Sequence, residues 1–545
     1  MENKLAPVQK SREPAIAKLM MAINGTDSDK PSRARFLSHD QAEQTLDFFK
    51  VAFGNPMSPG ELNDETLKKN VTISSGLTYY DLRAPALNLF PTVTPLRNTL
   101  PRLQRQHPGD SAHWKTITST VGSGQPFMGW VPEGQRSASM SYVTTNNSLS
   151  YMTIGEEDSL SEEARFAAEG FEDEDALVQL RLLLRTFIKE EAGLLGGDRS
   201  LALATPGTIV TGAGGTTSTV AAGTYSAYVV ALTQEGFLNS SVANGVAAAL
   251  TVTGNDGKTY VVNGGSSNKS AAQTQIVTST QNLTLSVPAV NGAVAYAWYA
   301  STPAGSETLQ TITTLNSVTF TSALTTTNQS ASAITANCST NTNYAFDGLL
   351  TWGFLTTSGA YVNTFATGPV GVGTPLTSSG MGSVNEIDTM FQAMWNKSLI
   401  SPTVMYVNSQ ELLNLTKRVM NGASSPLLRF VTETDAAGGV EYRATAAGVV
   451  AFYYNPFTPD GGVRIPINIH PNLAPGTILT WAENLPPWYV SNAVPEVAAV
   501  QTRQDYYAEV WPKVSRSQYY GIYSQEVLAV YAPFAIGILN NISNS

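Results

Sequence analysis

The chain carries little charge for its size, and one long stretch of it carries almost none. Charged residues make up 14% of the 545 residues, against roughly 25% in an ordinary globular protein. Aromatic residues make up 9%, which argues against a disordered chain. The apolar share is 42%, so serine, threonine, asparagine and glycine replace the missing charge. Between residues 201 and 340 the charged side chains are Glu235, Asp256, Lys258, Lys269 and Glu307.

Cysteine and long apolar runs are also scarce. Cys338 is the single cysteine, so disulfides within the chain are excluded and packing or assembly must stabilise it. The longest apolar run, Val527–Leu539, contains Pro533 and is shorter than the roughly 18 residues that a membrane span needs. No apolar segment follows the N-terminus, so we expect synthesis and use in the cytoplasm, without Sec export and without a membrane.

Histidine and positive charge are scarce as well. None of the four histidines has an H-x-x-x-H partner, so we expect no metal site and no cofactor. The net charge of −10 and the pI of about 5.1 disfavour a protein that binds nucleic acid over its whole surface. Residues 1–36 are mildly basic, which indicates either a basic arm or a merely solvated segment.

The first half of the sequence predicts an extended arm, a hairpin and a long helix. Gln41–Phe53 has helical periodicity, and the frequent prolines from Ala84 onward exclude regular helix. Residues 111–119 and 138–153 alternate like two strands around a Gly/Pro-rich tip. A helix is predicted from Asp173 to Leu195, preceded by a Ser159/Glu162 capping box and stopped by Gly196 and Gly197. Its predicted apolar face contains Leu177, Leu180, Leu184, Phe187 and Ile188, and is widened by Leu182 and Leu183.

The uncharged stretch predicts a β-sandwich inserted into another domain. Seven or eight short strand-like runs separated by turn signals lie between about Thr205 and Asn341, as in immunoglobulin or fibronectin-type domains. Helix and strand patterns resume at Tyr344: a helix whose predicted capping box is Ser383 and Glu386, the strand Thr403–Asn408, and a third helix. We therefore expect the chain to leave the host domain near Asp198 and to return near Tyr344.

Motifs that suggest chemistry have simpler interpretations. Gly257–Thr259 reads GKT, but the first glycine of a P-loop would fall on Val252, so a hairpin turn is expected. The acidic Glu156–Asp158 is either a calcium or acid/base site or, as we favour, a solvated lead-in to a helix. Trp130 and Glu133 could form a sugar-binding patch, but a structural contact is favoured. The sequence therefore does not support an enzyme.

The order of these segments resembles the major capsid proteins of tailed bacteriophages, which have the Hong Kong 97 fold. The resemblance rests on an extended arm, the motif W-V-P-E-G-Q at Trp130–Gln135, a return strand at Tyr142–Ile154, and a long helix ending in L-L-G-G-D. Phe346–Leu349 resembles the segment that follows that turn in the family. The resemblance excludes the sandwich.

The resemblance implies an α+β Hong Kong 97-type capsid fold with an inserted all-β Ig-like sandwich. The segments would be 1–106, an N-terminal arm; 107–158, an extended E-loop hairpin; 159–203, the spine helix of the peripheral (P) domain; 204–342, the sandwich; 343–480, the axial (A) domain; and 481–545, closing strands of the peripheral domain. Candidate assembly residues are Trp130, Glu133, Leu177, Leu184 and Phe187. The hairpin tip lacks lysine, so we expect noncovalent stabilisation rather than the isopeptide cross-links of some members.

In function, the resemblance implies a subunit that assembles as hexamers and pentamers into an icosahedral virion shell. The shell would enclose double-stranded DNA without sequence-specific binding, and its partners would be the portal and scaffold or decoration proteins. The sandwich would project outward, for stability or weak host-surface binding. The alternatives are an Ig-domain-bearing surface adhesin, a carbohydrate-binding structural protein and, less favoured, a polysaccharide-degrading enzyme.

Overall fold

The computed structural model describes residues 92–544, except for short gaps, as two compact units. One unit contains the described residues up to 104 together with 153–191 and 502–526, and the other contains the remainder. The predicted helix Gln41–Phe53, the basic segment 1–36 and most of the hairpin tip lie outside the described residues. The gaps are 105–108, 120–129, 137–142, 169–172, 216–217, 279–280, 380–381, 423–428, 435–439, 446–451, 460, 490–493 and 514.

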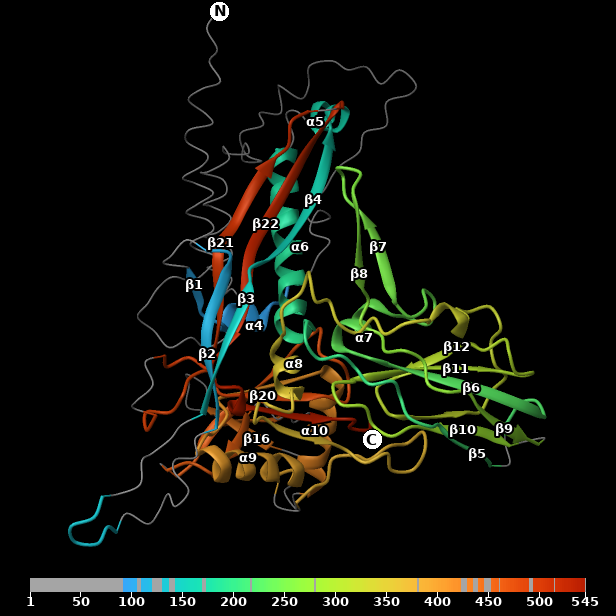
Figure 1. The fold of residues 1–545 in the computed structure, drawn as a ribbon. Coiled ribbons are helices and arrows are strands. Elements are labelled where there is room, and N and C mark those ends of the chain that lie inside the picture. The colour runs from blue at the N-terminus through green and yellow to red at the C-terminus, as the bar shows by residue number, and fades with distance from the viewer. Residues whose placement is uncertain are drawn as a thin grey trace, which may run out of the picture. The chain divides into compact units, whose positions relative to one another are not determined.

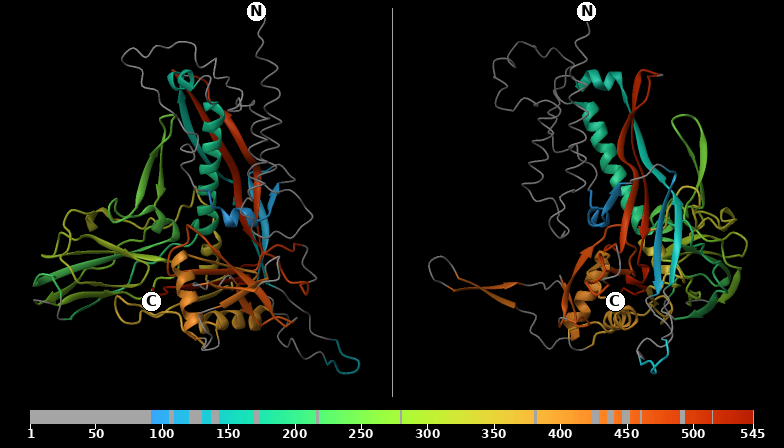
Figure 2. Two further views of the ribbon diagram at one scale, coloured as in Figure 1. Left: turned by 180° about the vertical axis from the view of Figure 1, so that it is seen from behind. Right: turned by 60° about the vertical axis from the view of Figure 1, so that its left-hand side comes forward.

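A long four-stranded sheet and a long helix form the first unit. The sheet has the order β1-β21-β22-β4, with β1 at Arg102–Gln104, β21 at Ala498–Val510, β22 at Ser517–Val530 and β4 at Met152–Ser161. The helix α6, Glu174–Gly196, runs beside these strands (Figures 1 and 2). The predicted long helix is thus confirmed to within about two residues at each end.

Charge and packing explain where α6 starts and which face it buries. The Asp173 carboxylate accepts a hydrogen bond from the Ala176 N–H at 3.3 Å, and two acidic residues in the first turn complement the helix dipole. The predicted apolar face is partly wrong, because Leu177, Leu180 and Ile188 are only half-buried. The core around the helix contains Leu160, Val178, Leu182, Leu183, Phe187, Tyr506, Tyr520 and Ile522.

Short helices flank this sheet, and the cap before the second of them is not the predicted one. Helix α4 spans Pro95–Thr99, and α5 spans Glu162–Ala168. Ser159 lies within β4, and it is the Ser161 hydroxyl that accepts a hydrogen bond from the Ala164 N–H at 3.3 Å. The predicted Ser159/Glu162 capping box is therefore wrong, since the strand continues two residues further than expected.

The predicted hairpin is confirmed as an antiparallel pair in the second unit. Strand β2, Ser111–Ser119, pairs along its length with β3, Val143–Ser150. The part of the pair nearer the tip is tied to the C-terminal part of the chain, where the Ile117 N–H donates to the Tyr531 carbonyl at 2.8 Å and the Thr116 hydroxyl donates to the Val530 carbonyl at 2.9 Å.

The charge-poor stretch between about Thr205 and Asn341 forms two antiparallel sheets around one core. One sheet has the order β13-β10-β5 and the other β12-β11-β6-β9. Side chains of both sheets meet in a cluster that includes Tyr225, Leu283, Leu285 and Trp298. The two-layer arrangement is present, while its assignment to the immunoglobulin class stays a prediction. The strands are β5 Val210–Gly214, β6 Gly223–Leu232, β9 Gln273–Val277, β10 Asn282–Ser286, β11 Ala295–Ser301, β12 Thr308–Thr313 and β13 Ser317–Phe320.

Three further elements belong to this segment, which we call the insert (residues 204–342). They are α7, Gln234–Asn239, the 3-10 turn η2, Ala331–Ala333, and a separate hairpin of β7, Ala249–Thr253, and β8, Thr259–Asn263. The hairpin turn contains Gly257 at φ 77 and includes the GKT sequence, so the hairpin interpretation of that motif is confirmed.

A six-stranded mixed sheet forms the centre of the second unit. Its order is β14-β23-β20-β15-β19-β18. Helices α9, Asn385–Ser398, and α10, Ser409–Gly422, contribute apolar side chains to its core. The helix–strand–helix order predicted after the insert is thus confirmed. The strands are β14 Tyr361–Thr364, β15 Val404–Val407, β18 Phe452–Asn455, β19 Val463–Ile469, β20 Ile478–Trp481 and β23 Ile536–Asn540; α8 is Leu349–Phe354, η3 is Pro533–Ala535, and β16 Arg429–Thr434 pairs with β17 Val440–Thr445.

One further expectation fails in this unit. The residue before α9 is Val384, which makes no side-chain cap, and the Glu386 carboxylate instead accepts from the Thr377 N–H at 2.9 Å. The predicted Ser383/Glu386 capping box is therefore wrong. In the closing run the chain turns at η3 after β22, and β23 joins the six-stranded sheet that contains β15.

The two ends of the insert approach each other closely, as predicted. The Asn341 N–H donates to the Asp198 carbonyl at 2.8 Å, and the Gly348 N–H donates to the Gly197 carbonyl at 2.8 Å. Gly197 is required by this approach rather than by a left-handed turn, since a Cβ there would lie 2.6 Å from the Phe346 carbonyl oxygen.

Buried asparagines join the insert to the C-terminal residues of the chain. The Asn541 amide accepts from the Asn316 N–H at 3.0 Å and donates to the Asn316 side chain at 3.1 Å and to the Phe365 carbonyl at 2.8 Å. The Asn540 amide donates to the Ala293 carbonyl at 2.7 Å. Asn541 has φ 64, a conformation that asparagine tolerates better than most residues. These contacts make the insert an integral part of the second unit.

We expect Asn541→Ala to lower the free energy of unfolding of the second unit by about 2–4 kcal/mol, because it leaves buried partners unsatisfied and places alanine at positive φ. Asn541→Gly is the matched control, since it removes the same amide without the backbone strain and should cost about 1 kcal/mol less. Hydrogen exchange under increasing denaturant measures both variants. Loss of protection in β11 without loss in β20 would contradict the integral role of the insert.

Candidate functional site

A buried ionic network holds α4 and β1 against α6, β21 and β22. The Arg102 guanidinium donates to Glu190, to Asp505 at 2.7 Å and to Glu526 at 2.8 Å. The Arg97 Nε lies 3.2 Å from a Glu190 carboxylate oxygen. The Arg97 Cζ lies 3.7 Å from the centroid of the Phe187 ring, in a cation–π contact. Every one of these side chains is nearly inaccessible to solvent except Asp505.

The network also fixes the start of α4. The Glu191 carboxylate accepts hydrogen bonds from the Leu96 and Arg97 backbone N–H groups, both at 2.8 Å. These are orphan donors at a helix N-terminus, and a carboxylate there is favoured by the helix dipole. Residues about 95 positions apart are thereby joined, which anchors the described end of the N-terminal segment on the long helix.

Burial and charge compete in this network. Burial alone would lower the pKa of Arg102, but the carboxylates Glu190 and Glu526 raise it above its usual range. Burial, reinforced by the neighbouring Glu190, raises the pKa of Glu526 above that of an ordinary carboxyl. One Glu526 oxygen and the Arg102 Nε have no hydrogen-bond partner among the described residues. The buried charges are therefore incompletely paired, and removing one partner should strongly lower the free energy of unfolding.

The helix residues proposed for assembly have internal roles in the structure. Phe187 is 4% exposed and packs edge-on against the Tyr506 ring, with centroids 5.1 Å apart. Leu184 is half-buried against the same core, and Leu177 is half-buried as well. Sequence periodicity alone identified them as an apolar face but could not say that a sheet of the same chain covers it.

Trp130 and Glu133 both lie on the exposed part of the hairpin tip. Trp130 is 94% exposed and Val131 is 43% exposed. Pro132 accepts a backbone hydrogen bond from Gln135 at 3.1 Å, which makes a turn around Gly134 at φ 78. Glu133 is exposed in this turn. A whole indole ring in water is costly, so this tip is a candidate contact surface.

A face of the long sheet carries half-buried tyrosines that sequence analysis missed. The Tyr507 and Tyr523 rings on β21 and β22 lie with centroids 5.9 Å apart, and the Tyr523 hydroxyl donates to Glu157 on β4. Gly521 leaves room for this arrangement, since a Cβ there would lie 2.7 Å from the Tyr523 ring. The signal in the sequence was the abundance of tyrosines in the last part of the chain, but the strand register is needed to show which of them share a face.

Three carboxylates gather where the insert meets the rest of the second unit. Burial raises the pKa of Asp198 to about 8, and the neighbouring Asp347 and Glu235 add to the rise. Burial likewise raises the pKa of Glu235 to about 7. The Asp347 carboxylate accepts hydrogen bonds from the Arg199 and Ser200 N–H groups at 2.8 and 2.9 Å. We therefore expect the stability of this junction to depend on pH.

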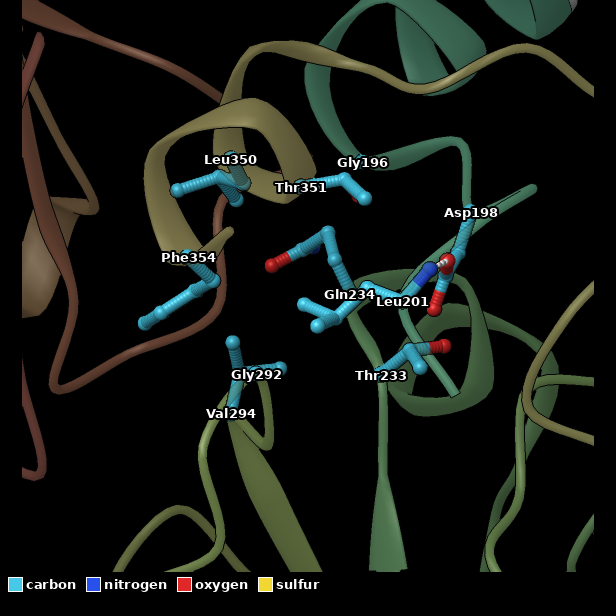
Figure 3. Close-up of a pocket in the computed structure, with 10 residues that line it drawn as sticks. All are labelled: Gly196, Asp198, Leu201, Thr233, Gln234, Gly292, Val294, Leu350, Thr351 and Phe354. Atoms are coloured by element: carbon cyan, nitrogen blue, oxygen red, sulfur yellow. Dashed lines mark hydrogen bonds between the residues drawn. The ribbon is translucent and has the colours of Figure 1, made fainter. Parts of the chain in front are cut away.

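A small cavity adjoins the junction (Figure 3). Its water-accessible volume is about 10 Å³, roughly the room for one water molecule. Its lining includes Asp198, whose carboxylate accepts from the Leu201 N–H at 2.9 Å, and Gln234, whose side chain also contacts residues 472 and 474. The cavity is a packing feature of the junction and is too small for an organic ligand.

The remaining candidate groups also have structural partners. Glu156, on β4 rather than in a helix lead-in, pairs with Arg185 at 3.0 Å and with Lys189. His470 is fully buried, and its Nδ1 accepts from the Asn472 N–H at 3.2 Å. Burial raises the pKa of the Cys338 thiol. Among the described residues no group of three or more potential ligands could hold a metal ion, and no helix is long and apolar enough to cross a membrane.

Comparison with known proteins gives matches in structure only. No family model and no curated protein matches the sequence. Similar solved structures include the capsid of a native GTA particle (10% identity, 88% of this chain and 100% of that chain, TM-score 0.37), the capsid of Cyanophage P-SCSP1u (7%, 86% and 93%, 0.36) and the capsid of Myoviridae Phage XM1 (8%, 89% and 100%, 0.34). All three are described as capsids.

We expect Arg102→Met to lower the free energy of unfolding of the first unit by about 3–5 kcal/mol, because Glu526 would stay buried without its cation and Glu190 would lose one of its two cations. Arg516→Met is the matched control: its partner Glu163 lies 2.8 Å away, but the two side chains are 78% and 61% exposed, and the cost should stay below about 1 kcal/mol. Urea unfolding followed by circular dichroism makes the comparison. Equal losses in the two variants would contradict the role of the buried network.

We expect the second unit to become less stable as pH rises. The folded-state pKa of Asp198, about 8, lies above the unfolded value near 4, so its stabilising effect is complete below pH 4 and is lost as pH rises towards 8. Between pH 5 and 7.5 the wild type should lose about 2 kcal/mol more than Asp198→Asn. Urea midpoints across this range provide the measurement, with Asp256→Asn in the exposed hairpin turn as control. Parallel profiles for wild type and Asp198→Asn would refute this.

Proposed function

We propose that this chain is the major capsid protein of a tailed phage, a subunit that assembles with copies of itself into a closed icosahedral shell. The observation that carries the proposal is the tip of the hairpin, where Trp130 is 94% exposed. An aromatic side chain presented so fully to water at the end of an extended element is typical of a contact residue. The motif W-V-P-E-G-Q that contains it also supports the family resemblance.

The build of the first unit supports the same proposal. Helix α6 and the strands β4, β21 and β22 form a long, thin layer with few residues to make a thick core. The buried network of Arg97, Arg102, Glu190 and Glu526 joins its elements in addition to this core. A shell subunit needs elements that are joined in this way, because loads between copies must be carried without unfolding.

The finer features of the proposal follow the resemblance. The shell would consist of hexamers and pentamers and would enclose double-stranded DNA without reading its sequence, as expected for a net charge of −10. Portal, scaffold and decoration proteins would be its partners. The insert would belong to the outer surface, where its low charge suits contacts with other copies or weak binding to host surfaces.

We expect purified wild-type protein to form closed shells in negative-stain electron microscopy, and Trp130→Ala to raise the concentration of free subunits by about tenfold or more. Loss of a buried indole contact costs on the order of 2 kcal/mol or more. Trp130→Phe keeps most of the apolar area and should restore assembly in part. Sedimentation separates shells from subunits. Wild-type protein that stays monomeric at high concentration would contradict the proposal.

A further inference from the structure

The hairpin of β7 and β8 is a ribbon with one apolar face and one polar face. Its register places Leu250 opposite Val262 and Val252 opposite Tyr260. Directly opposed residues of an antiparallel pair share a face, and alternate residues of a strand share a face. These four apolar side chains therefore lie together. The opposite face contains Ala249, Thr251, Thr253, Thr259, Val261 and Asn263.

The apolar face is incompletely covered by the described part of the chain. Leu250 is 45% exposed and Tyr260 is 43% exposed. The Tyr344 ring, itself 50% exposed, lies 5.7 Å from the Tyr260 ring and extends the same surface. The ribbon reaches away from the two sheets of the insert (Figures 1 and 2) and forms a sheet of two strands only. Two strands with an open apolar face are marginally stable in water.

The distribution of charge supports a second copy of this chain as the partner that covers the apolar face. Identical copies bring like charges together, and at a net charge of −10 most surfaces of two copies repel each other. The ribbon avoids this cost, since its charged residues are Asp256 and Lys258 in the turn, which pair at 3.6 Å. A contact about a two-fold axis brings the same patch of both copies together, so a face without charged side chains can meet itself without electrostatic repulsion.

We propose that the apolar face of this ribbon packs against the same face of the ribbon in a second copy of the chain, about a two-fold axis of the assembled shell. The inference rests on the proposed function. Four side chains and Tyr344 bury far less than the roughly 1,200 Å² of a stable interface. The contact therefore forms only when other contacts already hold the copies, and free subunits do not dimerise through it.

Isosteric substitutions test the contact. Val252→Thr with Val262→Thr replaces two methyl groups on the apolar face by hydroxyls, while Val261→Thr makes the same change on the polar face, where Val261 is 52% exposed. Threonine retains the strand preference of valine, so circular dichroism and thermal unfolding should be unchanged. The double variant should raise the free-subunit concentration at equilibrium with shells by about fivefold or more, and Val261→Thr should leave it unchanged.

Cross-linking identifies the partner surface. Leu250→Cys should give disulfide-linked dimers when assembled shells are oxidised with diamide, whereas Val261→Cys should not; wild type, whose Cys338 is buried, sets the background. Shells of Leu250→Cys without dimers above that background would overturn the inference, as would equal free-subunit concentrations for V252T/V262T and V261T.

The two proposals fail in different ways. If wild-type protein forms no shells, the proposed function is wrong. If wild-type shells form and V252T/V262T assembles like V261T, the ribbon contact is wrong while the proposed function stands. Dimers of Leu250→Cys in free subunits as readily as in shells would contradict the claim that assembly brings the ribbons together.

Discussion

The close approach of backbone at the end of the long helix is the constraint on which the second unit depends. A Cβ on Gly348 would lie 2.7 Å from the Gly193 carbonyl oxygen and 2.8 Å from the Gly197 nitrogen. Only glycine lets these segments meet, and their meeting allows the chain to leave at Asp198 and return at Asn341 across one hydrogen bond. An insertion of about 140 residues therefore disturbs the surrounding sheets little.

The insert is nevertheless more than an appendage. Asn316, Asn540 and Asn541 tie it to the last strand of the six-stranded sheet, and Gln234 reaches residues 472 and 474. Hydrogen bonds of buried amides are directional, so they fix the orientation of the insert as well as its attachment. A rigid attachment is what would allow a small ribbon at its edge to meet a partner reproducibly.

The first unit is held together by a buried ionic network as well as by apolar packing. Its long sheet and helix share a small apolar core, and buried ionic groups join α4 and β1 to them. Such a network adds little net stability over apolar packing, but it tolerates few alternative arrangements, since each displaced charge would be left unpaired. In a proposed shell subunit, a single well-defined arrangement of the elements matters more for assembly than additional stability does.

The sequence by itself determined the elements with strong local signals: the long helix between acidic and glycine ends, the paired strands of the hairpin, the β-rich insert and the return of its ends. It misplaced both capping boxes, because a serine three residues before a glutamate caps a helix only if the helix starts there, and β4 continued to Ser161. It gave no hint that Arg97 and Arg102 meet Glu190, Asp505 and Glu526, residues about 90 to 425 positions away. Tertiary structure alone decided those contacts, since burial and long-range pairing depend on which surfaces the whole chain brings together.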